Sequence, residues 1–145
     1  MKKITFFTLP IIMLMGACFF GPYILNGIKM RSQRLTHQMV CDEPWFSFIK
    51  SGTKPVEGRK NSPKYRNIKI GDVIEFVSDT GATFKTLVYE VREYRSLENY
   101  LNDVSIEKAL PGVSSLQEAL NIYHQWSTPE EVKRYGFLGI FVKPI

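Results

Sequence analysis

The feature that most constrains the fold of this chain is a charge-free run near its amino terminus. Ile4 to Ile28 is twenty-five residues long and contains no Asp, Glu, Lys or Arg. A helix of that length would extend about 37 Å, which is enough to cross the hydrocarbon layer of a membrane. About 105 residues remain after the run and its flank, enough for one hydrophobic core and too few for two.

We interpret the run as one membrane-spanning helix within residues 1–28, followed by a basic juxtamembrane linker over 29–40 and a folded domain over 41–145. In this interpretation the protein is a single-pass membrane protein anchored through residues 4–28. The charges on the two sides of the run nearly balance, so they do not set its orientation. The lone Cys41 needs no oxidising compartment, which favours a cytosolic C-terminal domain.

Two alternatives to the span stay open. Lys2 and Lys3 precede the apolar run, and Met15-Gly16-Ala17-Cys18 resembles a lipoprotein cleavage site, so the segment can also be a signal peptide. Phe19 to Ile28 remains apolar beyond that site, which favours the span. Alternatively, translation begins at Met30 or Met39 and the run is not part of the protein.

Charge is unevenly distributed within the domain. Residues 41–145 hold fourteen basic and fourteen acidic side chains. Between positions 50 and 69 there is one acid, Glu57, and seven basic residues: Lys50, Lys54, Arg59, Lys60, Lys64, Arg66 and Lys69. Such a cationic patch on an acidic body attracts phosphates, acidic lipids or carboxylates.

Three ionisable residues in this window, Lys54, Glu57 and Arg59, form the candidate site. Pro55 favours an extended conformation for Lys54, so a strand is expected after Gly52. Strand periodicity places Glu57 and Arg59 on one face and Lys54 on the other. The three side chains therefore converge only if Lys54 lies just outside the strand or a bulge redirects it. Without convergence, Glu57 and Arg59 form an ordinary solvated ion pair.

Metal and disulfide chemistry find no support in the sequence. The two cysteines, Cys18 and Cys41, do not form a disulfide framework. His37 and His124 are isolated, and neither has a second ligand at a metal-binding spacing. We therefore expect no metal site and no cofactor.

Hydrophobic periodicity and capping residues predict the remaining elements. A short helix carries Trp45, Phe48 and Ile49 on one face, and we interpret Trp45 as a core residue. Lys60 to Asn67 is expected to be a loop. The other predictions are strands over Val73–Val77, Thr83–Val91 and Phe137–Val142, and helices over Leu97–Leu101, Leu116–His124 and from Thr128 onward.

Strands that surround a helical insertion indicate an α+β domain. The final strand is far in sequence from its partners, and the strand over Thr83–Val91 has apolar residues on both faces. Both observations suggest a small closed or nearly closed sheet with peripheral helices, since closure removes exposed edges.

The order of several short motifs resembles an ASCH domain, which has a PUA-like fold. The motifs are Thr36-His37-x-Met39, Gly52-x-Lys54-x-x-Glu57-x-Arg59, Lys69-x-Gly71-Asp72-x-Ile74-x-Phe76, Leu110-Pro111-Gly112 and Lys133-x-Tyr135-Gly136-x-x-Gly139-Ile140. The resemblance runs from about Leu35 to Ile145, roughly three quarters of the chain. It implies a small β-barrel with a cleft beside the strand that carries Glu57 and Arg59.

Members of the superfamily that this resemblance points to often bind RNA or modified nucleosides. Some small bacterial relatives hydrolyse N4-acetylcytidine with a lysine, a threonine and a glutamate. Lys54 matches that lysine, Glu57 takes the threonine's place, and no carboxylate stands near Leu110 and Pro111, where the glutamate is expected.

The favoured hypothesis is that the domain binds RNA or a modified nucleoside or nucleotide in a cationic cleft. Arg59, Lys60 and Lys64 would bind phosphate, Lys54 and Glu57 would bind polar edges, and Tyr65 would stack on a base or pack over the end of the barrel. If the protein is instead an amidohydrolase acting on N4-acetylcytidine-like nucleosides, its catalytic residues are Lys54 and Glu57. A third possibility is an anchored protein-interaction module without catalysis.

Overall fold

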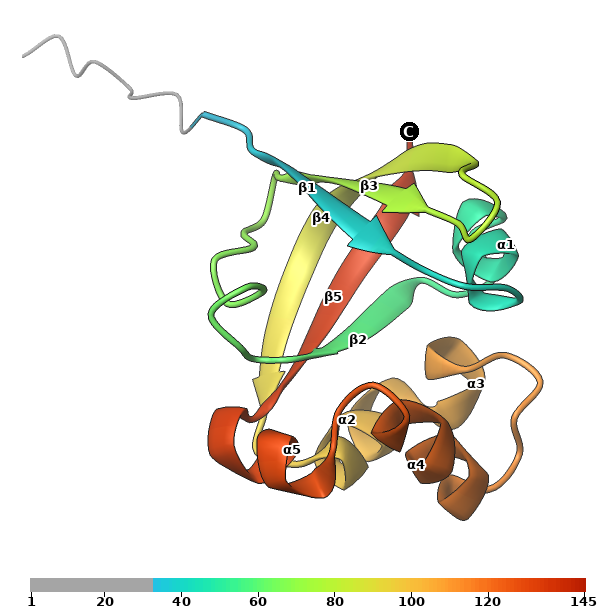
Figure 1. Ribbon diagram of the computed structural model, residues 1–145, viewed down its shortest axis with the longest axis vertical. Coiled ribbons are helices and arrows are strands. Elements are labelled where there is room, and N and C mark those ends of the chain that lie inside the picture. The colour runs from blue at the N-terminus through green and yellow to red at the C-terminus, as the bar shows by residue number, and fades with distance from the viewer. Residues whose placement is uncertain (1–32) are drawn as a thin grey trace, which may run out of the picture. The chain divides into compact units, whose positions relative to one another are not determined.

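Five strands form a curled sheet that is open between its first and last members (Figure 1). The computed structural model describes residues 33–145, and the segment interpreted as a membrane span lies outside the described residues. The strand order is β1-β3-β4-β5-β2, with β1 (Thr36–Val40) and β2 (Val56–Lys60) at the two edges. The predicted α+β class with peripheral helices is confirmed, and the sheet is a half-barrel rather than a closed barrel.

The remaining elements are short helices and the three inner strands. In chain order they are α1 (Trp45–Lys50), β3 (Val73–Val77), β4 (Thr83–Tyr94), α2 (Leu97–Val104), α3 (Ile106–Ala109), α4 (Leu116–His124), α5 (Pro129–Tyr135) and β5 (Phe137–Pro144). The predicted strand Val73–Val77 and helix Leu116–His124 have the expected bounds. The strand predicted from Thr83 continues three residues further, to Tyr94.

β1 was not expected as a strand. Residues 36–40, which the sequence analysis placed in the juxtamembrane linker, pair in parallel with β3, with Thr36 opposite Val73. Asp72 holds the start of this strand, because its carboxylate accepts hydrogen bonds from the backbone N of Leu35 and contacts His37 Nε2 at 2.8 Å. The described domain therefore includes this strand.

Two hydrophobic clusters lie on opposite faces of the sheet, and β5 contributes to both. Phe137 and Phe141 pack against α2 to α5, whereas Leu138, Ile140 and Val142 fill the concave side together with α1. This alternation follows the two-residue period of a strand. Because each face of the sheet covers one cluster, the central strands are apolar on both faces. The helices α2 to α5, which follow β4 in the chain, form a separate layer (Figure 1).

Within residues 33–145 no helix is both long enough and apolar enough to cross a membrane. The same region contains no group of three or more His, Cys, Asp or Glu side chains placed to hold a metal ion.

Candidate functional site

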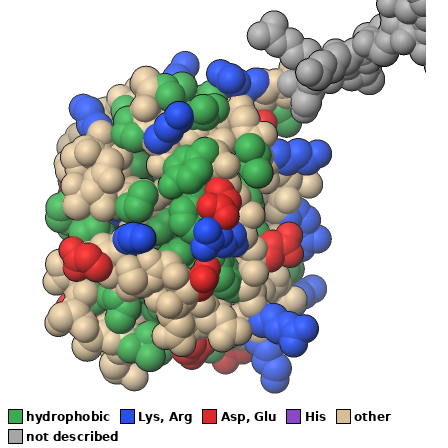
Figure 2. Space-filling view, turned by 180° about the vertical axis from the view of Figure 1, so that it is seen from behind, with side chains coloured by type: hydrophobic (Ala, Val, Ile, Leu, Met, Phe, Trp, Pro, Cys, Tyr) green, Lys and Arg blue, Asp and Glu red, His purple; other side chains and the backbone are tan. Residues whose placement is uncertain are grey.

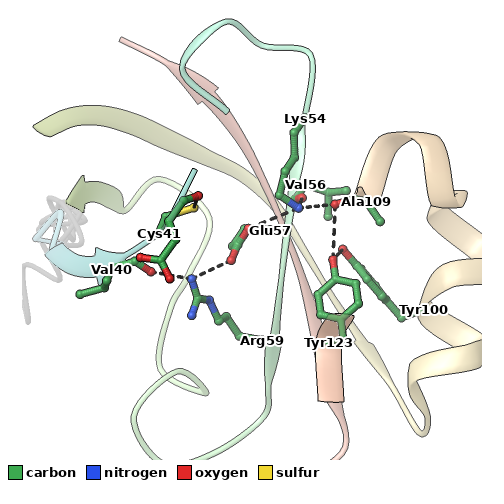
Figure 3. A network of polar contacts seen from close by, with 10 residues as sticks. Val40, Cys41, Lys54, Val56, Glu57, Arg59, Tyr100, Ala109 and Tyr123 are labelled. Atoms are coloured by element: carbon green, nitrogen blue, oxygen red, sulfur yellow. Dashed lines mark hydrogen bonds and ion pairs between the residues drawn. The ribbon is translucent and has the colours of Figure 1, made fainter. Parts of the chain in front are cut away.

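The side chains of Lys54, Glu57 and Arg59 meet at the open seam between β1 and β2 (Figure 3). Gly52 ends α1 with φ +81°, and the chain then turns so that Lys54 lies two residues before β2 begins. Lys54 thus lies outside the strand, so the alternation of side chains along β2 does not determine the direction of its side chain. Glu57 and Arg59 share the concave face, while Gly58 between them faces the helices. The convergence required by the sequence analysis is present.

Lys54 is a buried ammonium with all three of its protons engaged. Its Nζ donates to Val56 O at 2.8 Å and to Ala109 O, and it lies 3.3 Å from Glu57 Oε2. Burial lowers the pKa of Lys54, but electrostatic interactions with Tyr123 and Glu57 raise it, and the net pKa lies above its ordinary value. Burial also raises the pKa of the Tyr123 hydroxyl, which stays protonated at neutral pH, so the Glu57 carboxylate is the charge that keeps Lys54 protonated.

Glu57 is held from both sides. Arg59 Nη2 lies 2.7 Å from Oε1, and Lys54 Nζ approaches Oε2. The carboxylate is only 6% exposed, so the two cations compensate its loss of hydration. Its position is therefore set by two charged partners before any ligand arrives.

Arg59 connects the two edges of the open sheet. Its Nη2 also donates to Val40 O at 2.9 Å, which links β2 to β1 through a side chain. The Arg59 side chain is 19% exposed, and its Nε, which is buried, has no hydrogen-bond partner within residues 33–145. The guanidinium therefore keeps donor capacity that a ligand can use. Burial lowers and Glu57 raises the pKa of Arg59, with a net rise, so the guanidinium remains charged.

A cavity of about 530 Å³ opens beside these three residues. Its walls come from both edges of the seam and from the helical layer: Val40, Cys41, Asp42, Trp45, Lys54, Glu57, Gly58, Arg59, Lys60, Ser62, Lys64, Tyr65, Leu110, Tyr123, Trp126 and Ser127. The volume lies within the range of small-molecule binding sites in proteins. Buried Lys54, partly buried Arg59 and the buried Glu57 carboxylate together carry a net charge of +1, which favours a ligand with an anionic or electron-rich oxygen.

All six residues predicted for the site line this cavity. Lys60 is paired with Glu131 Oε1 at 2.6 Å, so its charge is partly compensated. Lys64 is exposed and lies 5.1 Å above the Tyr65 ring, and Tyr65 also packs on the concave core. The other basic residues of the 50–69 window, Lys50, Arg66 and Lys69, do not line it.

Sequence reasoning missed the part of the cavity that the helical layer contributes. Tyr123 and Trp126 come from α4 and the turn after it, far along the chain from Lys54. Trp45, interpreted as core, is half-buried and also lines the cavity. The Cys41 thiol lies there too, but burial, followed by Glu57, raises its pKa to about 12, so it stays protonated and is a poor nucleophile.

The arrangement favours binding over catalysis by Lys54. A lysine nucleophile or base must be neutral, and here the ammonium is retained and saturated with acceptors. Lys54 orients Glu57, and the groups left to meet a ligand are the remaining lone pairs of Glu57 and the donor capacity of the Arg59 guanidinium.

Similar structures share this fold. Residues 39–144 match the family model described as the ASCH domain. The crystal structure of hypothetical protein PH0355 is 36% identical, with a TM-score of 0.70, and the alignment covers 77% of this chain and all of that one. Protein PF0455 from Pyrococcus furiosus is 34% identical, with a TM-score of 0.65 over 77% of this chain and 98% of that one.

A more distant structure shares the fold alone. The ASCH protein from Zymomonas mobilis is 13% identical, with a TM-score of 0.55 over 76% of this chain and 70% of that one. None of the curated proteins compared with this chain matches it. The family model covers β2 to β5 and all of the helices, and it begins within β1. On this evidence the chain belongs to the ASCH domain family, with its PUA-like fold, over residues 39–144.

Proposed function

We propose that this ASCH domain binds RNA or a modified nucleoside or nucleotide in the cavity at the open seam. The observation that carries the proposal is the buried Lys54–Glu57–Arg59 cluster, which faces a 530 Å³ cavity with a net positive charge and aromatic walls. Arg59 can donate hydrogen bonds to the phosphate or carbonyl oxygens of such a ligand, and Glu57 can accept hydrogen bonds from its N–H groups. The aromatic side chains that line the cavity can pack against a base.

A localised site fits the surface better than a broad nucleic-acid platform on the face seen in Figure 2. There, apolar side chains occupy the middle together with charges of both signs, and Lys and Arg lie along the top and one side without forming a contiguous basic face. Proteins that bind duplex backbones present a contiguous basic face. The cavity at the seam, about 530 Å³, has the size of a small-molecule site, so we favour a single nucleotide or a single-stranded segment as the ligand.

Two variants test the proposal by RNA binding. Lys64→Ala removes an exposed rim cation, and we expect the dependence of log affinity on log salt for short single-stranded RNA to become shallower by about 0.7. Arg59→Ala removes a donor to the ligand, and we expect affinity to fall about tenfold or more. Fluorescence anisotropy with labelled RNA at several salt concentrations measures both.

Lys133→Ala is the matched control, because Lys133 is exposed on α5 and does not line the cavity. Unchanged affinity and salt dependence in both site variants, with their folding verified by circular dichroism, would contradict the proposal. Incubation with N4-acetylcytidine tests the amidohydrolase alternative, and release of cytidine that disappears in Lys54→Ala would favour it over binding alone.

We also propose that residues 4–28 anchor the domain to a membrane, with the C-terminal domain in the cytosol. The support is the charge-free run described above. We expect the full-length protein to remain in the membrane pellet after alkaline carbonate and to enter the supernatant only with detergent. Extraction by carbonate or salt alone would be incompatible with a spanning helix.

A further inference from the structure

One aromatic side chain at the cavity is exposed to an extent that packing does not explain. Trp126 lines the cavity and is 46% exposed, although it lies only two residues after the end of α4. Tryptophan carries the largest apolar surface of any side chain, and leaving nearly half of it in water forgoes burial energy. Its position beside Lys60 and Ser127 at the cavity suggests that another molecule covers it.

The backbone around Trp126 is held in place by several hydrogen bonds. The backbone N of Trp126 donates to Tyr123 O at 3.1 Å, and Ser127 N donates to the same oxygen at 3.0 Å. The ring of His124 contacts Ser127 O through Nδ1 at 2.9 Å. The turn is therefore ordered without help from the indole.

A contact from the sheet fixes the same turn against β2. Lys60 Nζ lies 3.5 Å from Trp126 O and 2.6 Å from Glu131 Oε1. The other oxygen of Glu131 accepts the backbone N–H of Thr128 at 3.1 Å and so caps α5. Lys60 thus connects the candidate site to the turn that carries Trp126, so a ligand there meets a backbone that is already ordered.

We propose that Trp126 is a ligand-contacting residue on which a planar heterocyclic ring of the ligand stacks, with Lys60 and Glu131 as positioning residues. This inference rests on the proposed function and specifies it: the ligand carries an exposed base, next to the oxygen that Arg59 binds. A base splayed out of a single strand, or that of a free nucleotide, has such a face, whereas a base inside a duplex does not.

The sequence makes this proposal directly measurable. The chain has two tryptophans, Trp45 and Trp126, and both line the cavity. In the full-length Trp45→Phe variant Trp126 is the single tryptophan, so its fluorescence reports on the indole alone. We expect the four nucleoside 5′-monophosphates, or a short single-stranded RNA, to quench this fluorescence after correction for their absorbance. Ribose 5-phosphate, which has the phosphate and sugar without a ring, should not quench it.

Calorimetric titration gives the second readout. Trp126→Ala should weaken binding of the same ligands about fivefold to 150-fold, the effect of losing one stacked base, and Trp126→Phe should retain most of the affinity. Tyr89→Ala is the matched control, since Tyr89 is 44% exposed and does not line the cavity, and its affinity should stay within about twofold of wild type.

The outcomes separate the two proposals. If wild type binds a nucleotide or RNA while Trp126→Ala binds equally well and the indole fluorescence does not respond, the stacking role is wrong and the proposed function stands. If wild type binds none of these ligands, the proposed function fails and the stacking role fails with it.

Discussion

Replacing Lys54 with methionine is expected to lower the free energy of unfolding by about 3–5 kcal/mol, the usual effect of removing one partner from a buried ion pair. Methionine has a similar shape, so the loss is electrostatic rather than a cavity. The substitution removes the Lys54 donor from Val56 O and leaves Ala109 O with the hydroxyl of Tyr123 at 3.4 Å. It also leaves Glu57, 6% exposed, with Arg59 as its remaining charged partner. Each buried acceptor without a partner adds its own desolvation cost.

Urea denaturation of the variant measures this change, and Lys143→Met, an exposed lysine on β5, is the control that should change stability by about 0.5 kcal/mol or less. The double variant Lys54→Met with Glu57→Gln should lose less than the sum of the single variants, because it removes both buried charges. A loss below about 1 kcal/mol in Lys54→Met would show that this contact does not support the fold.

Gly58→Ala is expected to cost about 3 kcal/mol, at the upper end of the range for overpacking a core. A Cβ at this position would lie 2.8 Å from Phe137 Cε1, 2.9 Å from Tyr123 Cε1 and 3.0 Å from Tyr100 Cζ. These rings cannot withdraw easily, because they are buried and pack on one another with centroids 5.0 to 5.7 Å apart. Thermal or urea denaturation measures the cost.

Gly139→Ala provides a graded comparison on the neighbouring strand. Gly139 lies directly opposite Gly58 in the β2–β5 pairing, and a Cβ there would approach Tyr94 to 3.1 Å and Tyr100 to 3.2 Å. It should therefore destabilise the domain less than Gly58→Ala does. Equal stability of Gly58→Ala and wild type would mean that the aromatic layer yields to one methyl group, contrary to its close packing.

Much of the fold could be predicted because its signals are local. Capping residues and alternation identified β3, α4 and most of β4 and β5 from short windows. β1 was missed because only Met39 and Val40 in it are apolar, and its pairing partner β3 is parallel and distant in sequence. α3 is four residues long and has no side-chain cap, so no local sequence pattern predicts it.

The candidate site, like the fold, could be predicted only where its signals are local in the sequence. Lys54, Glu57 and Arg59 lie within six residues. The geometry of a strand and the effect of Pro55 therefore predicted the condition under which their side chains converge. The family resemblance implied a cleft beside this strand, but residue patterns alone could not predict the seam, since it depends on β1 and β2 remaining unpaired at opposite ends of the sheet. Tyr123 and Trp126 line the cavity because β5, the strand that follows the helical layer, pairs with β2. No local sequence pattern predicts this pairing.

The bridge from Arg59 to Val40 has a consequence for how the family can diversify. Where two strands are joined by a ladder of backbone hydrogen bonds, their separation is fixed near 5 Å and only the side chains can vary. Here the described gap between β1 and β2 is spanned by a guanidinium that donates to one carbonyl. Since no strand ladder fixes this gap, substitution at position 59 can change the contact across the binding site while the ladder β1-β3-β4-β5-β2 stays the same.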